Sequence, residues 1–506
     1  MKPEPIKKDD KYSMNTIQMP RFYLPECYNA YRQVLFDVVR IFFPQFQWTE
    51  EAELSELSAQ QISVKTIQME QNEQTWALSI GENRSVFHVE GLDENQRRRL
   101  LKQRLYAFLQ EYTSQKEHPW GIMTGVRPTK IVHRCLDEHM SEEQIRDMLQ
   151  QDYLMDEDKT DLLLDVTARQ RNFLLSREEA KEKVSIYLSI PFCPTRCAYC
   201  SFPAFALPKP KLQEEYLTNL LRECRAVGEA LRQSRKEIQT IYIGGGTPTS
   251  LSEPQLARLL EGVQNYLGGD TLAEFTVEAG RPDTITREKL MILHDYKAGR
   301  ISINPQSFLQ KTLDAIGRRH SVEQIYEVYD MARQIGFDSI NMDLITGLTG
   351  ETADDFAYSL EQIARLEPEN VTVHTLAIKR TARLERNQFS DAQSCIVEDM
   401  HKRMHRWLSD TSYVPYYLYR QKHMIGDQEN TGYCLPGKES IYNIQMMEER
   451  QTIFGLGVGS TSKYVNTADW TLTQSSNPKD LIFYNQRIDE IIDKKIEKIR
   501  EMCKTE

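Results

Sequence analysis

Short apolar runs alternate with longer amphipathic stretches between about residue 182 and residue 380. The runs are rich in β-branched residues and have the length of buried strands, whereas the stretches between them repeat their apolar residues at helical spacing. Strands that alternate with helices in this way predict a parallel sheet built from βα units. Six strands are predicted, at residues 184–190, 238–244, 274–279, 300–305, 339–345 and 371–376.

The flanking regions follow different patterns. Before residue 175, a helical pattern at 28–44, a hairpin pattern at 75–90 and a charged helical stretch at 93–113 indicate an α+β unit. After residue 380 the alternation of strands and helices loosens. The predicted fold class is therefore α/β, with an N-terminal α+β domain (1–175), a partial (β/α)6 barrel (182–380) and a C-terminal elaboration packed on the barrel (381–506).

Charge and cysteine content exclude several classes of protein. The net charge is −11, so we expect no nucleic-acid partner, because proteins that bind nucleic acids carry basic surfaces. No apolar run approaches the roughly 18 residues that span a bilayer, and the polar N-terminus lacks the apolar core of a signal peptide. We therefore expect a cytoplasmic protein without a membrane span. Its nine cysteines are not expected to form disulfides, because the cytosol keeps thiols reduced.

Three cysteines gather directly after the first predicted strand. Cys193, Cys197 and Cys200 have the spacing C-x3-C-x2-C and lie in the first βα loop, where parallel sheets carry their chemistry. Thiolates select zinc, copper or iron–sulfur clusters, and a structural zinc site takes four protein ligands. No further Cys or His stands close by in the sequence. Three thiolates suit a [4Fe–4S] cluster in which one iron has no protein ligand. There are two alternatives: a zinc site with a distant fourth ligand, and three unconnected thiols.

Further polar and glycine residues stand at the ends of the later strands. The run Gly244–Thr247 follows the second strand; glycines let a backbone approach a ligand closely, although such a run also suits a tight turn. Glu278 closes the third strand, and Asp343 lies within the apolar fifth strand. A carboxylate inside an apolar strand is costly unless it is paired, so Asp343 is the stronger indication of a site.

The segment 187–202, YLSIPFCPTRCAYCSF, resembles the signature of the radical S-adenosylmethionine (SAM) enzymes. It is similar above all to the oxygen-independent coproporphyrinogen III oxidases (coproporphyrinogen dehydrogenases) and their heme-chaperone relatives. The long N-terminal region and the stretch 416–434 resemble the HemZ-type branch of that family. The resemblance implies a partial (β/α)6 radical SAM barrel.

The resemblance also implies a site. Cys193, Cys197 and Cys200 would hold a [4Fe–4S] cluster, and SAM would chelate the open iron. The late glycine-rich segment 454–462 resembles a loop that closes over SAM. No catalytic residue is assigned. The expected SAM contacts are Tyr187, Tyr199, Gly245, Gly246, Thr247, Glu278, Gln306, Arg318 and Asp343.

The implied activity is that of an oxidoreductase of heme and porphyrin biosynthesis. A 5′-deoxyadenosyl radical would remove hydrogen from the propionates of coproporphyrinogen III, and loss of an electron and carbon dioxide would give the vinyl groups of protoporphyrinogen IX. A reduced flavodoxin- or ferredoxin-type protein would supply electrons. Because the tetrapyrrole substrate carries carboxylates, Arg420, Lys422 and His423 are candidate contacts, although ordinary loop polarity explains them equally well.

Two positions depart from the family pattern. Ser189 stands where the family often has His, and Phe202 stands where the well-established bacterial oxidases have a further cysteine. The form around Phe202 is shared with the heme chaperones. A heme-binding, chaperone-like protein is therefore one alternative, and a radical SAM methyltransferase or ring-opening enzyme acting on heme is another.

Overall fold

The computed structural model describes residues 20–43, 46–59, 64–114, 117–200, 202, 204–377, 391–422 and 424–504. Contacts divide the chain into two compact units. One comprises Met1–Thr124 and Asp147–Asp156, and the other comprises Gly125–Arg146 and Glu157–Glu506. The predicted domain limits near residues 175–182 and 380 stay a prediction, because compactness alone does not say which segments fold on their own.

The first unit contains a five-stranded sheet and the helices that cover it. Its elements are β1 (Arg21–Tyr23), α1 (Arg32–Phe42), β2 (Gln47–Thr49), α2 (Leu54–Ala59), β3 (Val64–Gln71), β4 (Thr75–Ile80), β5 (Asn83–His88) and α3 (Glu94–Thr113). The strand order is β2–β1–β3–β4–β5, and the predicted hairpin is β4–β5. α1 contacts α3, and the amphipathic pattern of both helices buries Leu35, Val39 and Leu105.

The second unit is built on an eleven-stranded sheet. Its strands are β6 (Lys183–Ile190), β9 (Glu237–Gly245), β10 (Glu274–Gly280), β11 (Arg300–Ile303), β12 (Ser339–Thr346), β13 (Asn370–Thr375), β14 (Val414–Tyr419), β15 (Asn430–Cys434), β16 (Thr452–Leu456), β17 (Thr461–Val465) and β18 (Leu472–Ser476). Its main helices are α4 (Thr129–Asp137), α6 (Glu157–Gln170), α8 (Pro210–Gln233), α9 (Glu253–Leu267), α10 (Arg287–Asp295), α11 (Gln310–Ala315), α12 (Val322–Ile335), α13 (Ala353–Leu366), α14 (Asp391–Ser409), α15 (Ile441–Glu448), α16 (Leu481–Gln486) and α17 (Ile488–Lys504).

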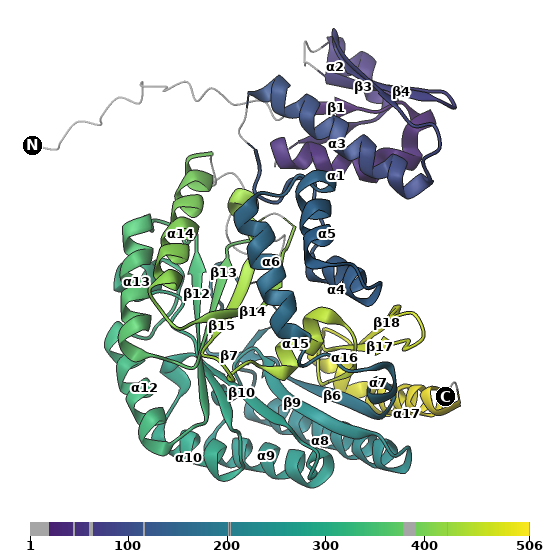
Figure 1. The fold of residues 1–506 in the computed structure, drawn as a ribbon. Helices are drawn as coiled ribbons and strands as arrows, with labels where there is room; N and C mark the ends of the chain where they lie inside the picture. The colour runs from purple at the N-terminus through teal and green to yellow at the C-terminus, as the bar shows by residue number, and fades with distance from the viewer. Residues whose placement is uncertain are drawn as a thin grey trace, which may run out of the picture. The chain divides into compact units, whose positions relative to one another are not determined.

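The six predicted βα units form the centre of this sheet. β6, β9, β10, β11, β12 and β13 are neighbours in chain order and run parallel. Figure 1 shows α8, α9, α10, α12 and α13 along the outer side of the sheet. Alternate residues of β6, such as Val184, Ile186 and Leu188, are buried with side chains of α8 in one apolar cluster. The predicted α/β partial barrel is confirmed.

The C-terminal region extends the sheet at both edges. β16 pairs in parallel with β6, and β17 and β18 continue that edge as antiparallel strands. At the other edge, β15 pairs antiparallel with β13 and β14 pairs with β15. The C-terminal elaboration is therefore not only packed on the barrel, because its strands share backbone hydrogen bonds with the first and the sixth barrel strand.

Helix α15 lies inside the curve of the sheet. The Glu274 carboxylate, at the first residue of β10, accepts hydrogen bonds from Ser440 Oγ (2.9 Å) and the Ile441 backbone N–H (2.7 Å) at the start of α15. Tyr442 stacks on Tyr242 with ring centroids 4.4 Å apart. These contacts place α15 toward the amino ends of the strands, so the loops after the carboxyl ends border the open side of the barrel.

Candidate functional site

The cysteine loop leaves the carboxyl end of β6. Two short strands, β7 (Phe192–Cys193) and β8 (Phe205–Ala206), pair with each other and close the base of the loop. The Ala198 backbone N–H donates to the Ile316 carbonyl at 3.0 Å, which ties the loop to the end of α11. Cys197 is buried and Cys193 and Cys200 are half-buried. The loop is therefore held at its base and near its middle.

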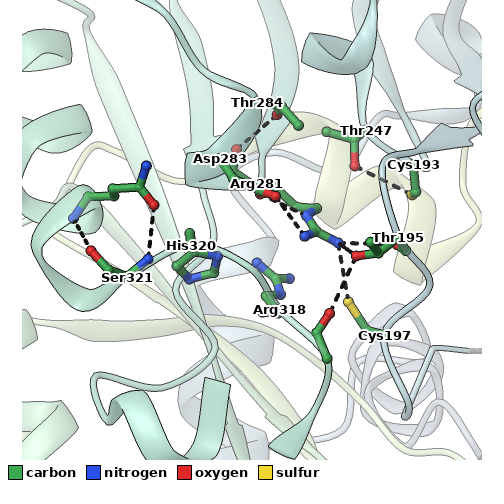
Figure 2. A network of polar contacts seen from close by, with 12 residues as sticks. Cys193, Thr195, Cys197, Thr247, Arg281, Asp283, Thr284, Arg318, His320 and Ser321 are labelled. Atoms are coloured by element: carbon green, nitrogen blue, oxygen red, sulfur yellow. Dashed lines mark hydrogen bonds and ion pairs between the residues drawn. The ribbon is translucent and has the colours of Figure 1, made fainter. Parts of the chain in front are cut away.

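Two buried guanidinium groups approach the loop (Figure 2). Arg281 pairs with Asp283 at 2.8 Å, donates to Thr195 Oγ1 at 2.8 Å and lies 3.8 Å from Cys197 Sγ. Arg318 is 8% exposed; burial acts against its charged form, but the neighbouring Tyr199 and Cys197 outweigh burial and raise its pKa above the ordinary value. Positive charge beside sulfur favours thiolates, so the surroundings of Cys197 suit an anionic sulfur ligand.

The loop offers the donors of a thiolate-ligated group. Within the described part of the chain, no three His, Cys, Asp or Glu side chains are arranged as a closed metal-binding group. Three free thiols nevertheless come from one loop, and two buried arginines lie beside it. Soft thiolates without a fourth protein ligand fit an iron–sulfur cluster in donor type. The assignment of Cys193, Cys197 and Cys200 as its ligands remains a proposal.

The glycine loop after β9 lies against the cysteine loop. Gly245 has φ +110°, and a Cβ on Gly246 would lie 2.6 Å from the Phe192 carbonyl oxygen, so side chains are excluded at both positions. The Gly246 backbone N–H donates to the Ile190 carbonyl at 2.8 Å. Thr247 Oγ1 lies 3.5 Å from Cys193 Sγ. The glycines thus let two βα loops approach each other, and Thr247 faces the first cysteine.

Glu278 faces the inside of the barrel next to that loop. The Tyr242 hydroxyl donates to Glu278 Oε1 at 2.5 Å, and the Tyr187 ring stacks on Tyr242 with centroids 6.2 Å apart. Desolvation raises the pKa of Glu278 to about 7, the Tyr242 hydrogen bond opposes this rise, and the negative charge of Asp343 adds to it. Burial also raises the pKa of the Tyr187 hydroxyl. Glu278 is therefore a carboxyl group that can hold or release a proton near neutral pH.

Gln306, Tyr199 and Arg318 form a hydrogen-bonded chain. The Tyr199 hydroxyl donates to Gln306 Oε1 at 3.0 Å, and Arg318 Nη2 donates to the Tyr199 hydroxyl at 3.1 Å. Gln306 has φ +69°, and its backbone N–H donates to the Asp343 carbonyl at 2.9 Å. Arg318 Nη1 also donates to the Asn304 carbonyl at 2.6 Å. The structure thus brings together predicted residues from the cysteine loop and two strand ends.

Asp343 has a neighbour that the sequence analysis missed. Asn341 Nδ2 donates to Asp343 Oδ1 at 2.8 Å, and His374 Nε2 lies 3.7 Å from Asp343 Oδ2. His374 Nδ1 lies 3.4 Å from the Tyr419 hydroxyl. In β13, Thr372 and His374 alternate with the buried Val371 and Val373, a period of two that places polar residues on one face. That alternation was the available signal for His374.

Arg281 was also missed, although AGRPDT follows Glu278 directly in the sequence. An arginine directly after a strand is unremarkable in a sequence, and only the fold brings it to Cys197. Among the proposed carboxylate contacts, Arg420 is buried and forms an ion pair with Asp427 at 2.7 Å. Lys422 is exposed, and His423 lies outside the described residues. Arg420 is therefore already neutralised within the chain.

The late glycine-rich loop follows β16 and lies beside the end of β6. A Cβ on Gly457 would lie 2.8 Å from the Ser189 carbonyl oxygen. Glu223 of α8 accepts a hydrogen bond from the Gly457 backbone N–H at 2.8 Å and forms a buried ion pair with Lys495 of α17 at 2.8 Å. Asn477 Nδ2 donates to the Gly457 carbonyl at 2.9 Å. Contacts with the C-terminal region thereby hold this loop in place. The strand before it, β16, is separated in the sheet from β9, which leads into the glycine loop, by β6 alone.

The sequence of this chain is similar to those of known proteins. The model of the Radical SAM superfamily matches residues 187–363. The chain is 45% identical over 387 residues to the oxygen-independent coproporphyrinogen-III oxidase-like protein HemZ of Bacillus subtilis, covering 76% of this chain and 77% of that protein. It is 32% identical over 281 residues to the heme chaperone HemW of Bacillus subtilis, covering 54% of this chain and 70% of that protein.

A solved structure shares the fold. The coproporphyrinogen III oxidase HemN of Escherichia coli aligns with a TM-score of 0.50 and 24% identity, over 64% of this chain and 73% of that chain. In the part of the chain that the structure describes, no helix has the length and apolar character needed to cross a bilayer. The predicted resemblance is confirmed: the chain belongs to the radical SAM superfamily and, within it, to the family of oxygen-independent coproporphyrinogen III oxidase-like proteins.

Proposed function

We propose that this protein binds a [4Fe–4S] cluster and SAM at the carboxyl end of its sheet and oxidatively decarboxylates the propionates of coproporphyrinogen III. Membership of the superfamily implies the cluster and SAM. The observation that carries the proposal is the convergence of the cysteine loop, the glycine loop and the chain Gln306–Tyr199–Arg318 at one end of the sheet. Parallel sheets carry their chemistry at that end.

When bound, the cluster and SAM supply the carbon radical that removes a hydrogen atom from the substrate. The cysteines would hold the cluster, and Arg281 and Arg318 would offset the negative charge of the sulfur ligands. Gly245 and Gly246 let the glycine loop lie against the start of the cysteine loop, so both loops would border bound SAM. Glu278 and Asp343 present carboxyl oxygens to the inside of the barrel, where they can accept hydrogen bonds from the hydroxyl or amino groups of SAM.

Aromatic side chains line the neighbouring part of the barrel. Tyr187, Tyr242 and Tyr442 stack together, and the Tyr419 ring lies parallel to that of Tyr417. Such rings exclude water from the inside of the barrel, which protects a reactive carbon radical from side reactions. They also offer flat apolar surfaces of the kind that pack against a large ring system. A tetrapyrrole is therefore the substrate class that we propose.

The proposed reaction is tested with cluster-reconstituted protein under anaerobic conditions. Wild-type protein with SAM, dithionite and coproporphyrinogen III should form 5′-deoxyadenosine and a product that has lost two carboxyl groups, as detected by mass spectrometry. The variant Cys197→Ala should form neither. Formation of 5′-deoxyadenosine without any decarboxylated product would contradict the substrate assignment, and absence of both in the wild type would contradict the radical chemistry.

A second candidate function is heme binding and delivery. Phe202 replaces the further cysteine of the well-established oxidases, and HemW is among the relatives. Titration with heme, followed by its Soret absorbance, tests this alternative: stable stoichiometric binding without decarboxylation would favour it. Mass spectrometry of the heme after incubation with SAM would reveal methyl transfer or ring opening, the remaining possibility.

A further inference from the structure

The cysteine loop borders a cavity. The β7–β8 pairing places Ala206 next to Cys193. A cavity of about 940 Å³ opens beside it. Its lining residues are Cys193, Thr195, Arg196, Ala204, Phe205, Ala206, Asp314, Gly317, Arg318 and Arg319. The first cysteine, Cys193, is therefore one of the residues that line this cavity.

This cavity has a positive rim on an acidic protein. Arg196, between Cys193 and Cys197, and Arg319, after α11, are both exposed. Arg318 adds a buried positive charge, and Asp314 is the one acidic residue among those lining the cavity. The chain as a whole has a net charge of −11. A local excess of arginines therefore distinguishes this place from the average surface and would attract an acidic partner over the range of a Debye length.

Two exposed apolar side chains belong to the same segment of the chain as the cysteines. Phe202 is 59% exposed and Leu207 is 45% exposed. Phe202 follows Cys200 closely, and Leu207 follows directly on β8. Exposed aromatic side chains together with arginines are enriched at protein–protein interfaces. We call this surface the cysteine-loop face, comprising Arg196, Phe202, Ala206, Leu207 and Arg319.

We infer that the cysteine-loop face is the docking surface for an acidic, single-electron donor protein of the flavodoxin type. The inference rests on the proposed function, in which each cleavage of SAM needs one electron from a donor. In the step, the donor loses one electron and the group held by the cysteines gains it; no bond forms and no proton moves. Docking here brings the donor against the loop that carries Cys193, Cys197 and Cys200.

Charge reversal on the face tests the docking directly. The affinity of cluster-reconstituted protein for purified oxidised flavodoxin is measured by calorimetry in the wild type and in Arg196→Glu/Arg319→Glu. We expect the double variant to bind at least about tenfold more weakly, because like charges across an interface oppose binding. Added salt should weaken wild-type binding and leave the double variant nearly unchanged. Arg196→Gln/Arg319→Gln should lie between the two, and a [2Fe–2S] ferredoxin serves as a second probe.

Arg235→Glu is the matched control. Arg235 is exposed just beyond the end of α8, and α8 has 24 residues, so its ends lie about 36 Å apart at 1.5 Å per residue. This variant should bind flavodoxin as the wild type does. Equal affinity of wild type and double variant, or no binding of either probe to the wild type, would overturn the inference. SAM cleavage driven by dithionite is a separate readout that needs no donor protein. If the double variant still cleaves SAM with dithionite, its defect lies in docking. If the wild type does not cleave SAM with dithionite, the proposed function is overturned instead.

Discussion

Burial affects the charge of Glu278 more than its hydrogen bonds do. The carboxyl group accepts a hydrogen bond from Tyr242, yet desolvation dominates and its pKa rises to about 7. At neutral pH, a carboxyl group with such a pKa is neutral or ionised depending on small changes in the charge and solvation of its surroundings. Binding of a cationic sulfonium ligand nearby would favour the ionised form, so Glu278 couples the protonation of the barrel interior to ligand binding.

Glu278 should make the stability of the protein depend on pH. Its pKa is about 7 when folded against 4.5 ordinarily, so the folded state holds a proton that the unfolded state releases. The corresponding stabilisation of about 3 kcal/mol is present below pH 4.5 and is lost as the pH rises through 7. Urea unfolding should therefore show that the wild type loses unfolding free energy relative to Glu278→Gln as the pH rises from 5 to 8, because the glutamine cannot ionise. A difference independent of pH would contradict this assignment.

His374 should orient Asp343. The imidazole lies 3.7 Å from the Asp343 carboxylate and its side chain is 29% exposed, so it is accessible to a ligand in the barrel. We expect His374→Ala to weaken SAM binding about tenfold, equivalent to about 1.4 kcal/mol, as measured by calorimetry on cluster-reconstituted protein. Tyr419→Phe, which removes only the hydroxyl near His374, should change SAM affinity less. Unchanged SAM affinity with weakened tetrapyrrole binding would instead assign His374 to the substrate.

The residues of the site differ in how far the sequence could predict them. Cys193, Gly246 and Gln306 stand in motifs whose order along the chain is visible in the sequence. The contact partners of those residues are not visible in the sequence, because they depend on which strands become neighbours and in which register. Asp343 meets His374 because β12 pairs with β13 so that Ile345 lies opposite His374, and no local pattern encodes that register.

At the scale of elements, the network around Glu223 holds the late glycine-rich loop. Glu223 accepts hydrogen bonds from Gly457, Asn477 and Tyr484 and pairs with Lys495. All of these lie in the C-terminal region, whereas Glu223 belongs to the first helix of the barrel. The late loop is thus fixed by two segments far apart in the chain, and its position depends on a buried ion pair.

Breaking that ion pair should be costly. Glu223→Ala leaves the 4% exposed Lys495 without its carboxylate, and we expect a loss of about 3–5 kcal/mol of unfolding free energy, as for other broken buried pairs. Urea unfolding measures it. The double variant Glu223→Leu/Lys495→Met, which removes both charges, should recover part of the loss. Glu229→Ala on the same helix removes the exposed partner of Arg225 and should have no measurable effect; a similar loss in this control would contradict the argument.

The barrel strands were predictable because each is a short apolar run between helical patterns. β16 was not recognised as a strand of the barrel, since its sequence TIFGL ends in the glycine-rich segment. Its partner, β6, lies more than 250 residues earlier in the chain, with Phe454 opposite Ile186. The same holds for β15 beside β13. The local sequence pattern predicts where strands and helices lie. The partner of an edge strand cannot be predicted in this way, because it depends on which apolar surface and backbone groups the rest of the sheet leaves exposed.

At the scale of the whole molecule, the sheet is continuous across the predicted domain limit at residue 380. The six βα strands occupy its centre, and strands from residues 381–506 flank both sides. Without them, β6 and β13 would each present an unpaired edge, and unpaired edges of buried parallel strands promote aggregation. The apolar faces of Tyr187 and Tyr242 would also lose the cover of Tyr442.

This arrangement predicts that residues 182–380 do not fold on their own. A chain limited to that range loses the pairing of Val184–Leu188 with Thr452–Leu456 and of Asn370–Val373 with Thr431–Cys434. We expect it to aggregate, or to unfold without a cooperative transition in urea when followed by circular dichroism. A chain of residues 125–506 keeps both pairings and the segment Gly125–Arg146 of the same compact unit, so it should unfold cooperatively and controls for the loss of the N-terminal region. A soluble, cooperatively folding 182–380 chain would show instead that the βα units are stable without their flanking strands, and that the C-terminal region serves the site rather than the fold.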